Sequence, residues 1–341
     1  MISLLRTCVL ATALIAVIAL AFAGVASAAE GEGAAATEPE PEAVAPEESK
    51  VPRAKLSVRL RGDGKIRIGK NAKARGTLKP YVAGERVAVT LKRSGKAVAT
   101  RNAKVKRIKG TDAGRFKFSA ELIEPGSYKV TAVHKRSSRL GEASGKTRRF
   151  SITYPSLRSG SHGNEVRILN RLLDDLGYVA GSGSKYGGPT ERAVLAYRKV
   201  NNMARTTNTT PGIFRDLAAG KGGFKLADPG KGKQIEVDIS RQVMALAVDG
   251  EAKRIYHVST GAAATPTVRG KWTFYRRTPG YNAIGMYWSS FWVRGYAIHG
   301  YKSVPTHPAS HGCVRTHLSV ATSIYDWIDD GPSGTTIYTY G

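Results

Sequence analysis

Cysteine is scarce in this chain of 341 residues, which contains only Cys8 and Cys313. Cys8 lies in an N-terminal apolar segment that we expect to be removed on export, so the mature chain keeps Cys313 alone. This excludes an intramolecular disulfide framework of the kind that small exported domains use. A lone thiol in an exported protein indicates intermolecular pairing, a reactive role, or a buried inert position.

Acidic residues are also few, with 26 Asp and Glu against 53 Lys and Arg and a formal charge of +27. Such a surface attracts nucleic acid, anionic lipid or anionic polymers, although it also suits a basic soluble protein with no specific partner. Export removes nucleic acid as a partner. We therefore expect the anionic polymers of a cell wall as possible partners.

The chain has one long apolar run, and it lies at the start. Residues 1–28 contain no acid and one base, Arg6, and they end in the small-residue pattern Ala26-Ser27-Ala28. This layout predicts a secretory signal peptide, the alternative being an uncleaved membrane anchor. No second run is long enough to span a membrane. We expect a secreted, extracytoplasmic protein of the cell wall, with no stable membrane span once the signal is cleaved.

A mainly β, multidomain organisation follows from the patterns after the signal. Residues 29–50 are rich in Glu, Pro and Ala, which predicts a disordered linker. Residues 51–153 alternate apolar and polar positions in short runs separated by turn residues, which predicts an antiparallel β-sandwich that resembles an immunoglobulin-like module. The runs are Leu56-Val58-Leu60, Val87-Val89-Leu91, Phe116-Phe118-Ala120-Leu122, Tyr128-Val130-Ala132 and Phe150-Ile152-Tyr154.

Helical patterns replace the strands in residues 154–221. We expect a helix from Val166 that stops near Gly177, a second from Thr190, as cap, to Val200, and a third opened by Thr210-Pro211. With the preceding Leu157–Gly163 stretch, this compact three-helix segment resembles the peptidoglycan-binding domain of cell-wall hydrolases. The resemblance implies wall binding, although a plain spacer remains the alternative.

Residues 222–231 are expected to form a linker, and strands resume in a third domain, residues 232–341. Its first strands contain Ile235, Val237 and Ile239, then Val243, Leu246 and Val248. Asp249-Gly250 signals a hairpin turn.

The chemistry concentrates around Cys313. Ala297-Ile298-His299-Gly300 should end a strand, and ten residues then separate His299 from Ser310-His311-Gly312-Cys313-Val314-Arg315. A thiol becomes a nucleophile when a base takes its proton and positive surroundings favour the thiolate. No Asp or Glu lies between Glu251 and Asp326. A helix is expected after Cys313, from the apolar positions Val320, Ala321, Ile324, Tyr325 and Ile328, so the thiol should precede a helix start. The N–H groups near Gly312 could then form an oxyanion hole.

A zinc site is the obvious alternative, because five histidines lie in this half of the chain. His307 and His311 have helical ligand spacing, but Pro308 and Gly312 argue against a helix that carries both. The absence of a nearby carboxylate also argues against a metallohydrolase base. We therefore expect no metal and no cofactor, with His257 and His317 in structural or surface roles.

The His-Gly pair, short loop and Ser-His-Gly-Cys-Val-Arg run resemble the active-site signature of the L,D-transpeptidase (YkuD-like) catalytic domain. Ile235-Glu236-Val237-Asp238 and Thr265-Pro266-Thr267 also match, so the resemblance spans residues 232–341. Two features depart from the family pattern: a shorter loop after His299 in comparison with many members, and Val268 where a second proline is common. Neither departure touches the reacting groups.

The resemblance implies a cysteine acyltransferase of peptidoglycan biosynthesis, cell-wall organisation and cell shape, and a carbapenem target. Cys313 would form a thioester with a donor stem peptide, and an acceptor stem would then complete a 3→3 cross-link, with His299 as the base. The residues expected to shape the substrate site and the oxyanion hole are Gly300, Ser310, His311, Gly312 and Arg315. A backbone carbonyl, at Gly300 or in the following loop, is expected to orient His299.

Two other functions remain open. An L,D-carboxypeptidase would use the same residues with water as acceptor and would trim tetrapeptide stems. A wall-binding structural protein with an inactive catalytic domain is the non-enzymatic alternative, and the intact His299–Cys313 pair argues against it.

Overall fold

The computed structural model describes residues 51–341. The predicted signal peptide and acidic linker therefore lie outside the described residues. Within the part that is described, no helix is both long and apolar enough to cross a membrane.

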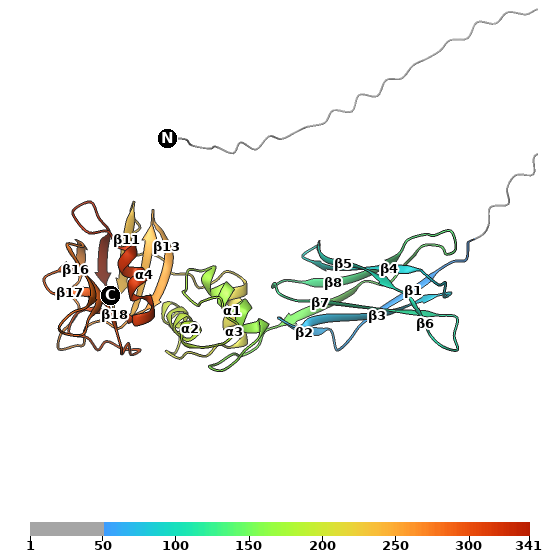
Figure 1. Cartoon of the computed structure of the whole chain (residues 1–341), viewed down its shortest axis with the longest axis horizontal. Helices are drawn as coiled ribbons and strands as arrows, with labels where there is room; N and C mark the ends of the chain where they lie inside the picture. Colours follow the sequence, from blue (N-terminus) through green and yellow to red (C-terminus); the bar gives the residue numbers. More distant parts are fainter. Residues whose placement is uncertain (1–50) are drawn as a thin grey trace, which may run out of the picture. The chain divides into compact units, whose positions relative to one another are not determined.

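Residues 51–153 form two β-sheets packed on a common core (Figure 1). One sheet has the order β1-β3-β7-β6 and the other the order β2-β10-β8-β4-β5, with β9 paired to β8. The strands are β1 (Lys55–Leu60), β2 (Lys65–Arg67), β3 (Asn71–Lys79), β4 (Arg86–Arg93), β5 (Lys96–Lys104), β6 (Lys106–Arg107), β7 (Gly114–Glu121), β8 (Tyr128–His134), β9 (Ala143–Ser144) and β10 (Arg148–Thr153).

The core of this module comes from the alternating positions that the sequence marks as apolar. Val58, Val89, Phe116 and Val130 are all essentially buried, while their neighbours along each strand point outward. Strand β3 is an addition to the predicted set. It alternates as the others do, but three of its four buried positions are the small residues Ala72, Ala74 and Gly76, which give a weak hydrophobic signal, and only Leu78 is large.

Three helices follow: α1 (Asn164–Asp174), α2 (Gly188–Val200) and α3 (Pro211–Ala218). The start of α3 is as expected, with Pro211 in the first turn and the Thr210 hydroxyl accepting a hydrogen bond from the Ile213 N–H at 3.3 Å. The expected cap of α2 is wrong. Gly187 precedes this helix, and Thr190 lies inside it, buried, with its hydroxyl donating to Asn170 Oδ1 at 2.9 Å.

The C-terminal part contains two further sheets, with orders β13-β12-β11-β19-β14 and β15-β16-β17-β18. Asp249 and Gly250 both have positive φ, as a tight hairpin between β12 and β13 requires. The elements are β11 (Lys233–Asp238), β12 (Val243–Val248), β13 (Glu251–His257), β14 (Gly270–Thr273), β15 (Arg276–Tyr281), β16 (Tyr287–Val293), β17 (Tyr296–Tyr301), β18 (Val314–His317), α4 (Leu318–Trp327) and β19 (Thr336–Tyr340).

The helical segment shares its core with the first of these sheets. Val243, Ala245 and Ile255 of β12 and β13 belong to the same buried cluster as Leu169 of α1 and Val194 of α2. Ile255 N–H also donates to the Gly177 carbonyl at 2.8 Å. Residues 154–221 are thus packed onto the C-terminal domain along a continuous apolar interface.

Candidate active site

The two predicted catalytic residues are brought together by a pair of parallel strands. His299 lies in β17, and Cys313 immediately precedes β18, with Ile298 opposite Val314 and His299 opposite Arg315. Because side chains alternate along a strand, His299 and Arg315 occupy one face while Ile298 and Val314 point into the core on the other. Cys313 lies in the bend before β18 and packs against the cluster that contains Ala297, which shares the face of His299 in β17.

His299 is held by its own backbone. Its side chain is only 3% exposed, and Nδ1 lies 2.9 Å from the Gly300 carbonyl oxygen. A carbonyl can only accept, so Nδ1 carries the proton and Nε2 keeps a free lone pair. Burial, aided by the positive charge of Arg315 and partly opposed by the Gly300 hydrogen bond, lowers the pKa of His299 to about 4. The imidazole is therefore neutral at neutral pH, the state a general base requires.

The Cys313 thiol lies in an apolar environment. It is partly buried against Met286, Phe291 and Ala297, and its Sγ lies 3.8 Å from the Gly295 carbonyl oxygen. Burial raises the pKa of the thiol, while a backbone hydrogen bond at Ala297 and the charge of Arg315 lower it by a smaller amount. The expectation that basic surroundings dominate is thus met only in part, because desolvation is the larger effect.

The helix predicted after Cys313 is α4, but it does not follow the thiol directly. Strand β18 intervenes, and α4 starts at Leu318 with the His317 side chain accepting from the Ser319 N–H as a cap. A helix dipole acts mainly within its first turn. The thiol therefore gains little from α4, and the charge that lowers its pKa is that of Arg315.

Ser310 and Gly312 set the backbone next to the thiol. The buried Ser310 hydroxyl donates to the Cys313 carbonyl at 2.5 Å and accepts from the Gly312 N–H at 3.1 Å. Gly312 has a φ of 108°, and a Cβ there would lie 2.1 Å from the Tyr296 ring. Only glycine fits this position. His311, in contrast, is exposed.

Two threonines that sequence reasoning quoted only as part of the family pattern hold the same loop. Thr265 Oγ1 donates to the Ser310 carbonyl at 3.0 Å, and Thr267 Oγ1 donates to the Gly312 carbonyl at 2.7 Å. Thr267 also accepts from the Gly261 N–H at 2.9 Å. The only sequence feature that points to these two threonines is the match of Thr265-Pro266-Thr267 to the family pattern.

Arg315 acts through an aromatic ring. Its guanidinium carbon lies 4.3 Å from the centre of the Tyr301 ring, which in turn meets the His299 ring edge-on at 5.7 Å between centres. Its main chain pairs with Ser259 in both directions. Arg315 thus contacts the site through its stacking on Tyr301 and its main-chain pairing with Ser259.

Comparison with known proteins decides the family. Residues 232–337 match the model of the L,D-transpeptidase catalytic domain. The crystal structure of an L,D-transpeptidase (residues 123–326) from Xylanimonas cellulosilytica is 31% identical with a TM-score of 0.50, and the alignment covers 54% of this chain and 97% of that one. The chain belongs to the L,D-transpeptidase family.

Other solved L,D-transpeptidases are similar at lower identity. The enzyme from Mycobacterium smegmatis is 13% identical, with 84% of this chain and 99% of that chain covered and a TM-score of 0.29. The C442S variant from Enterococcus faecium is 18% identical, with 38% and 62% covered and a TM-score of 0.29. No curated protein matches the chain.

The loop between the two candidate residues of this L,D-transpeptidase is held by the helical segment. Lys199 of α2 is 2% exposed, and its Nζ donates to His257 Nδ1 at 2.7 Å. His257 Nε2 donates in turn to the Val304 carbonyl at 3.0 Å. Burial lowers the pKa of Lys199 to about 6 and that of His257 to about 3.

Arg205, just after α2, reaches the same L,D-transpeptidase loop. It donates to the Thr306 carbonyl at 2.7 Å and to the Ser240 carbonyl at 2.9 Å. Ser259 Oγ adds a bond to the His307 carbonyl at 2.7 Å. The sequence predicts a structural or surface role for His257 and gives no role to Lys199 or Arg205. No group of three potential metal ligands occurs in residues 51–341.

Proposed function

We propose that this member of an acyltransferase family, which acts on peptidoglycan stem peptides, forms 3→3 cross-links through a Cys313 thioester. The observation that supports the proposal is the position of Cys313 beside Ala297, on the His299 face of β17, with the imidazole tautomer set by the Gly300 carbonyl. This leaves Nε2 as the proton acceptor on the face of the thiol.

Acylation begins when the Cys313 proton passes to His299 Nε2. The sulfur then attacks the carbonyl carbon of the third stem residue of a tetrapeptide, and the carbonyl oxygen becomes an oxyanion. Because the Gly312 N–H already donates to Ser310, the Cys313 N–H is the donor that we propose for this oxyanion. The bond to D-Ala breaks, the departing amine takes the proton from His299, and a thioester remains.

Transfer reverses these steps with another amine. The side-chain amine of a neighbouring stem attacks the thioester carbonyl and gives a proton to His299. The carbon–sulfur bond breaks, an amide forms, and the sulfur regains its proton. The thioester conserves the energy of the cleaved peptide bond, so no nucleotide is needed outside the cell.

The resting pair is neutral, and this suits a dyad without a carboxylate. The pKa of His299 is lowered and that of Cys313 is raised, so neither group is charged before the substrate arrives. Arg315 favours the thiolate once it forms. Gly300 lets β17 pack against α4, since a Cβ there would lie 2.6 Å from Ala321 Cβ. We assign Ser310, Gly312 and Arg315 to positioning, and exposed His311 to substrate contact.

The remaining assignments concern location and the other domains. We propose export through a signal peptide in residues 1–28, the linker 29–50, an immunoglobulin-like module in 51–153 and a wall-binding role for 154–221. The absence of acids from residues 1–28 supports the signal peptide. The family's action on peptidoglycan supports the wall-binding role.

Incubation of the mature protein with disaccharide tetrapeptides, followed by mass spectrometry, tests the function. Cross-linked dimer with released D-Ala is the expected product, and Cys313→Ala should give none. Released D-Ala without dimer would identify an L,D-carboxypeptidase. No reaction at all would favour a structural role.

A further inference from the structure

One row of residues crosses the catalytic sheet from its edge to the thiol. Arg276 of β15 lies directly opposite Phe291 of β16, and Phe291 lies directly opposite Ala297 of β17. Directly opposed residues of antiparallel strands point to the same face of a sheet. Phe291 and Ala297 pack with Cys313 in one cluster, so this is the face that carries the thiol. Arg276 therefore lies on the same face as Cys313, at the outer end of the row.

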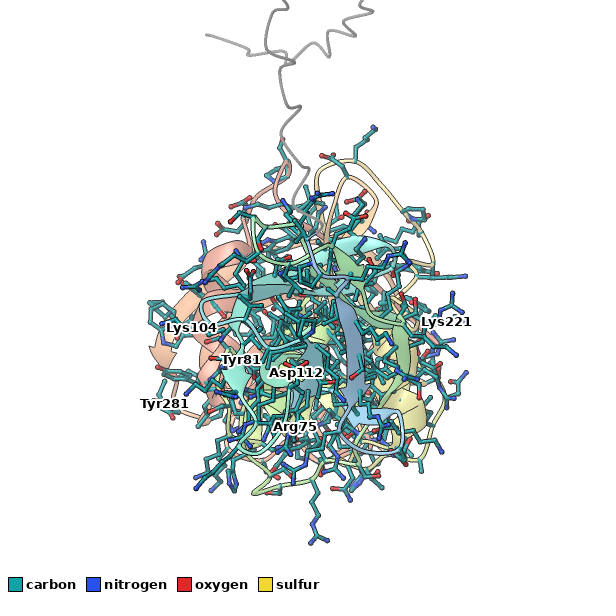
Figure 2. The ribbon with its side chains drawn as sticks, turned by 90° about the vertical axis from the view of Figure 1, so that its right-hand side faces the viewer. Arg75, Tyr81, Lys104, Asp112, Lys221 and Tyr281 are labelled. Atoms are coloured by element: carbon teal, nitrogen blue, oxygen red, sulfur yellow. The ribbon has the colours of Figure 1, made fainter. Side chains whose placement is uncertain are left out.

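The Arg276 guanidinium is held over an aromatic ring. Its carbon lies 4.1 Å from the centre of the Phe291 ring and 6.0 Å from the centre of the Tyr275 ring. Stacking of this kind sets the plane of a guanidinium and leaves the N–H groups at its rim free. Arg276 is otherwise exposed, because β15 is an edge strand, and Figure 2 shows Tyr281, the last residue of this strand, at the surface. The guanidinium is thus both positioned and accessible to a ligand.

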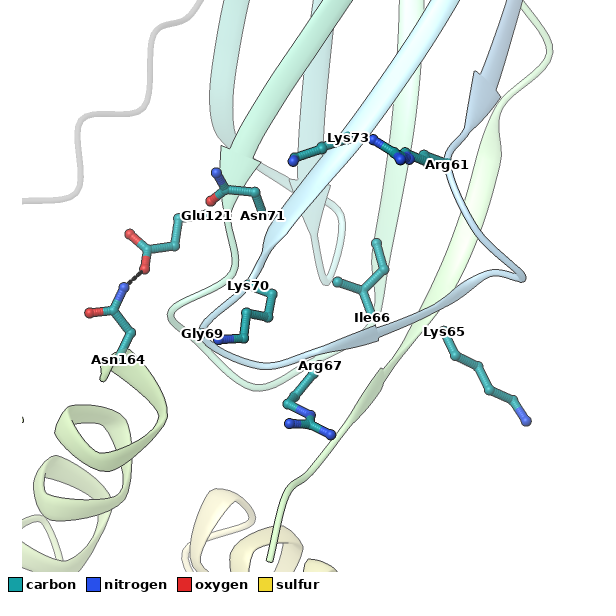
Figure 3. A pocket seen from close by; sticks show the side chains of 10 residues that line it. All are labelled: Arg61, Lys65, Ile66, Arg67, Gly69, Lys70, Asn71, Lys73, Glu121 and Asn164. Atoms are coloured by element: carbon teal, nitrogen blue, oxygen red, sulfur yellow. Dashed lines mark hydrogen bonds between the residues drawn. The ribbon is translucent and has the colours of Figure 1, made fainter. Parts of the chain in front are cut away.

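Arg276 has no acidic partner within residues 51–341, where none of the ion pairs involves it. Other cations are held by acids: in a hollow of about 800 Å³, Lys70 pairs with Glu165 at 2.8 Å, and Glu121 lines the same hollow (Figure 3). Around Cys313 the sequence offers no such acid, because residues 252–325 contain neither Asp nor Glu. The charge of Arg276 is therefore left for a ligand.

The neighbouring Arg277 shows the contrast. It lies opposite Ser290, on the other face of the sheet, where its guanidinium carbon is 4.0 Å from the centre of the Tyr325 ring of α4. It also donates to the Tyr325 carbonyl at 2.6 Å. The packing of α4 thus accounts for Arg277 and does not account for Arg276.

The chemistry of the ligand rests on the proposed function, which brings a tetrapeptide donor to Cys313. The last residue of that donor, D-Ala, has a free carboxylate that only the amide nitrogen and Cα separate from the carbonyl carbon under attack. Every tetrapeptide carries this carboxylate, whatever its diamino acid, and the Phe291 ring joins the Arg276 guanidinium to the cluster of the thiol. A guanidinium binds a carboxylate through two parallel N–H bonds. We propose that Arg276 binds the carboxylate of the departing D-Ala.

This contact makes Arg276 a residue that determines donor length. In a pentapeptide stem the same carboxyl group is part of an amide, which has no charge and cannot accept both N–H bonds of the fork. Tetrapeptide donors are therefore favoured over pentapeptide donors at the step that forms the thioester.

The test uses the full mature chain and two disaccharide tetrapeptides, one with a free terminal carboxylate and one in which that group is a carboxamide. Mass spectrometry of the released D-Ala or D-alaninamide gives kcat/KM for each donor. Wild type should prefer the free carboxylate about tenfold to a hundredfold, the scale of a charged hydrogen-bonded contact. Arg276→Gln should lose this preference by slowing the carboxylate donor alone. Arg294→Gln, which removes an exposed arginine from the turn between β16 and β17, is the matched control and should keep the preference.

A preference that survives in Arg276→Gln, or that falls equally in Arg294→Gln, would overturn the proposal, since another group or net charge alone would then read the carboxylate. Alkylation of Cys313 by uncharged iodoacetamide should proceed at the wild-type rate in both variants. Slower alkylation in Arg276→Gln would also overturn it, because Arg276 would then act on the thiol through Phe291. Turnover of both donors by wild type without a preference refutes this inference alone, whereas turnover of neither donor refutes the proposed function with it.

Discussion

At the scale of single residues, His299 predicts an unusual pH profile. Burial lowers its pKa from 6.5 to about 4. The imidazole therefore stays unprotonated, and active as a base, at pH values where an ordinary imidazole is already protonated. Acylation by a carbapenem should therefore persist at about pH 5 and be lost as the pH approaches about 4. Stopped-flow absorbance of the β-lactam measures it. His307→Gln, at an exposed residue, is the control. Loss of half the acylation rate near pH 6.5 in wild type, or a shifted pH profile in His307→Gln, would contradict this assignment.

Ser310 provides a second test at this scale. Its hydroxyl links the Cys313 carbonyl to the Gly312 N–H, so Ser310→Ala frees the backbone beside the thiol. The loss of this bridge should slow acylation about tenfold to a hundredfold, the scale of one or two hydrogen bonds at a buried site. Exposed Ser333→Ala is the matched control and should react at the wild-type rate. An unchanged rate in Ser310→Ala would remove Ser310 from the positioning set.

The sequence predicted the residues that belong to a local motif. His299 and Cys313 stand in short runs of recognisable spacing. A backbone carbonyl was predicted as the partner of the imidazole, at Gly300 or in the following loop, and the structure has it at Gly300. Thr267, Lys199 and Arg205 were not foreseen, because each reaches a loop far along the chain through a contact that only the tertiary fold creates. The dominance of burial over charge at Cys313 likewise depends on packing against Met286 and Phe291.

At the scale of elements, the loop between β17 and β18 depends on helix α2. Lys199→Met removes the donor to His257 Nδ1, whose ring holds the Val304 carbonyl. Carbapenem acylation should slow about tenfold as this support loosens. Exposed Lys221→Met in the same segment should have no effect. A wild-type acylation rate in Lys199→Met, with its unfolding temperature unchanged, would show that the loop does not need this support.

Element boundaries show where local patterns end. The hairpin at Asp249-Gly250 and the start of α3 at Pro211 follow from backbone chemistry and were predicted correctly. Strand β18 was missed, because its four residues lie directly before a helix and pair with β17 in parallel, a long-range contact with no local signature. Thr190 is not the helix cap that the sequence predicts, because its hydroxyl bonds to Asn170 inside the fold.

At the scale of the whole molecule, the helical segment and the catalytic sheet form one packing unit. Deleting residues 154–221 would expose Val243, Ala245 and Ile255 and remove both Lys199 and Arg205. The catalytic domain should therefore lose its cooperative unfolding transition, and acylation by a small carbapenem should be abolished. Residues 51–153 have a core of their own, apart from Ile68, which packs into the cluster of the helical segment. Deleting them should spare acylation. Full acylation after removal of 154–221 would show that the segment is only a wall anchor or spacer.

The central claim is that Cys313 carries the acyl group of a peptidoglycan stem. The most direct measurement is peptide mapping by mass spectrometry of the mature protein quenched during turnover of a disaccharide tetrapeptide. We expect a donor adduct that has lost D-Ala, located on the peptide that contains Cys313, and no adduct in Cys313→Ala. An adduct on another residue, or cross-linked product from Cys313→Ala, would contradict the account.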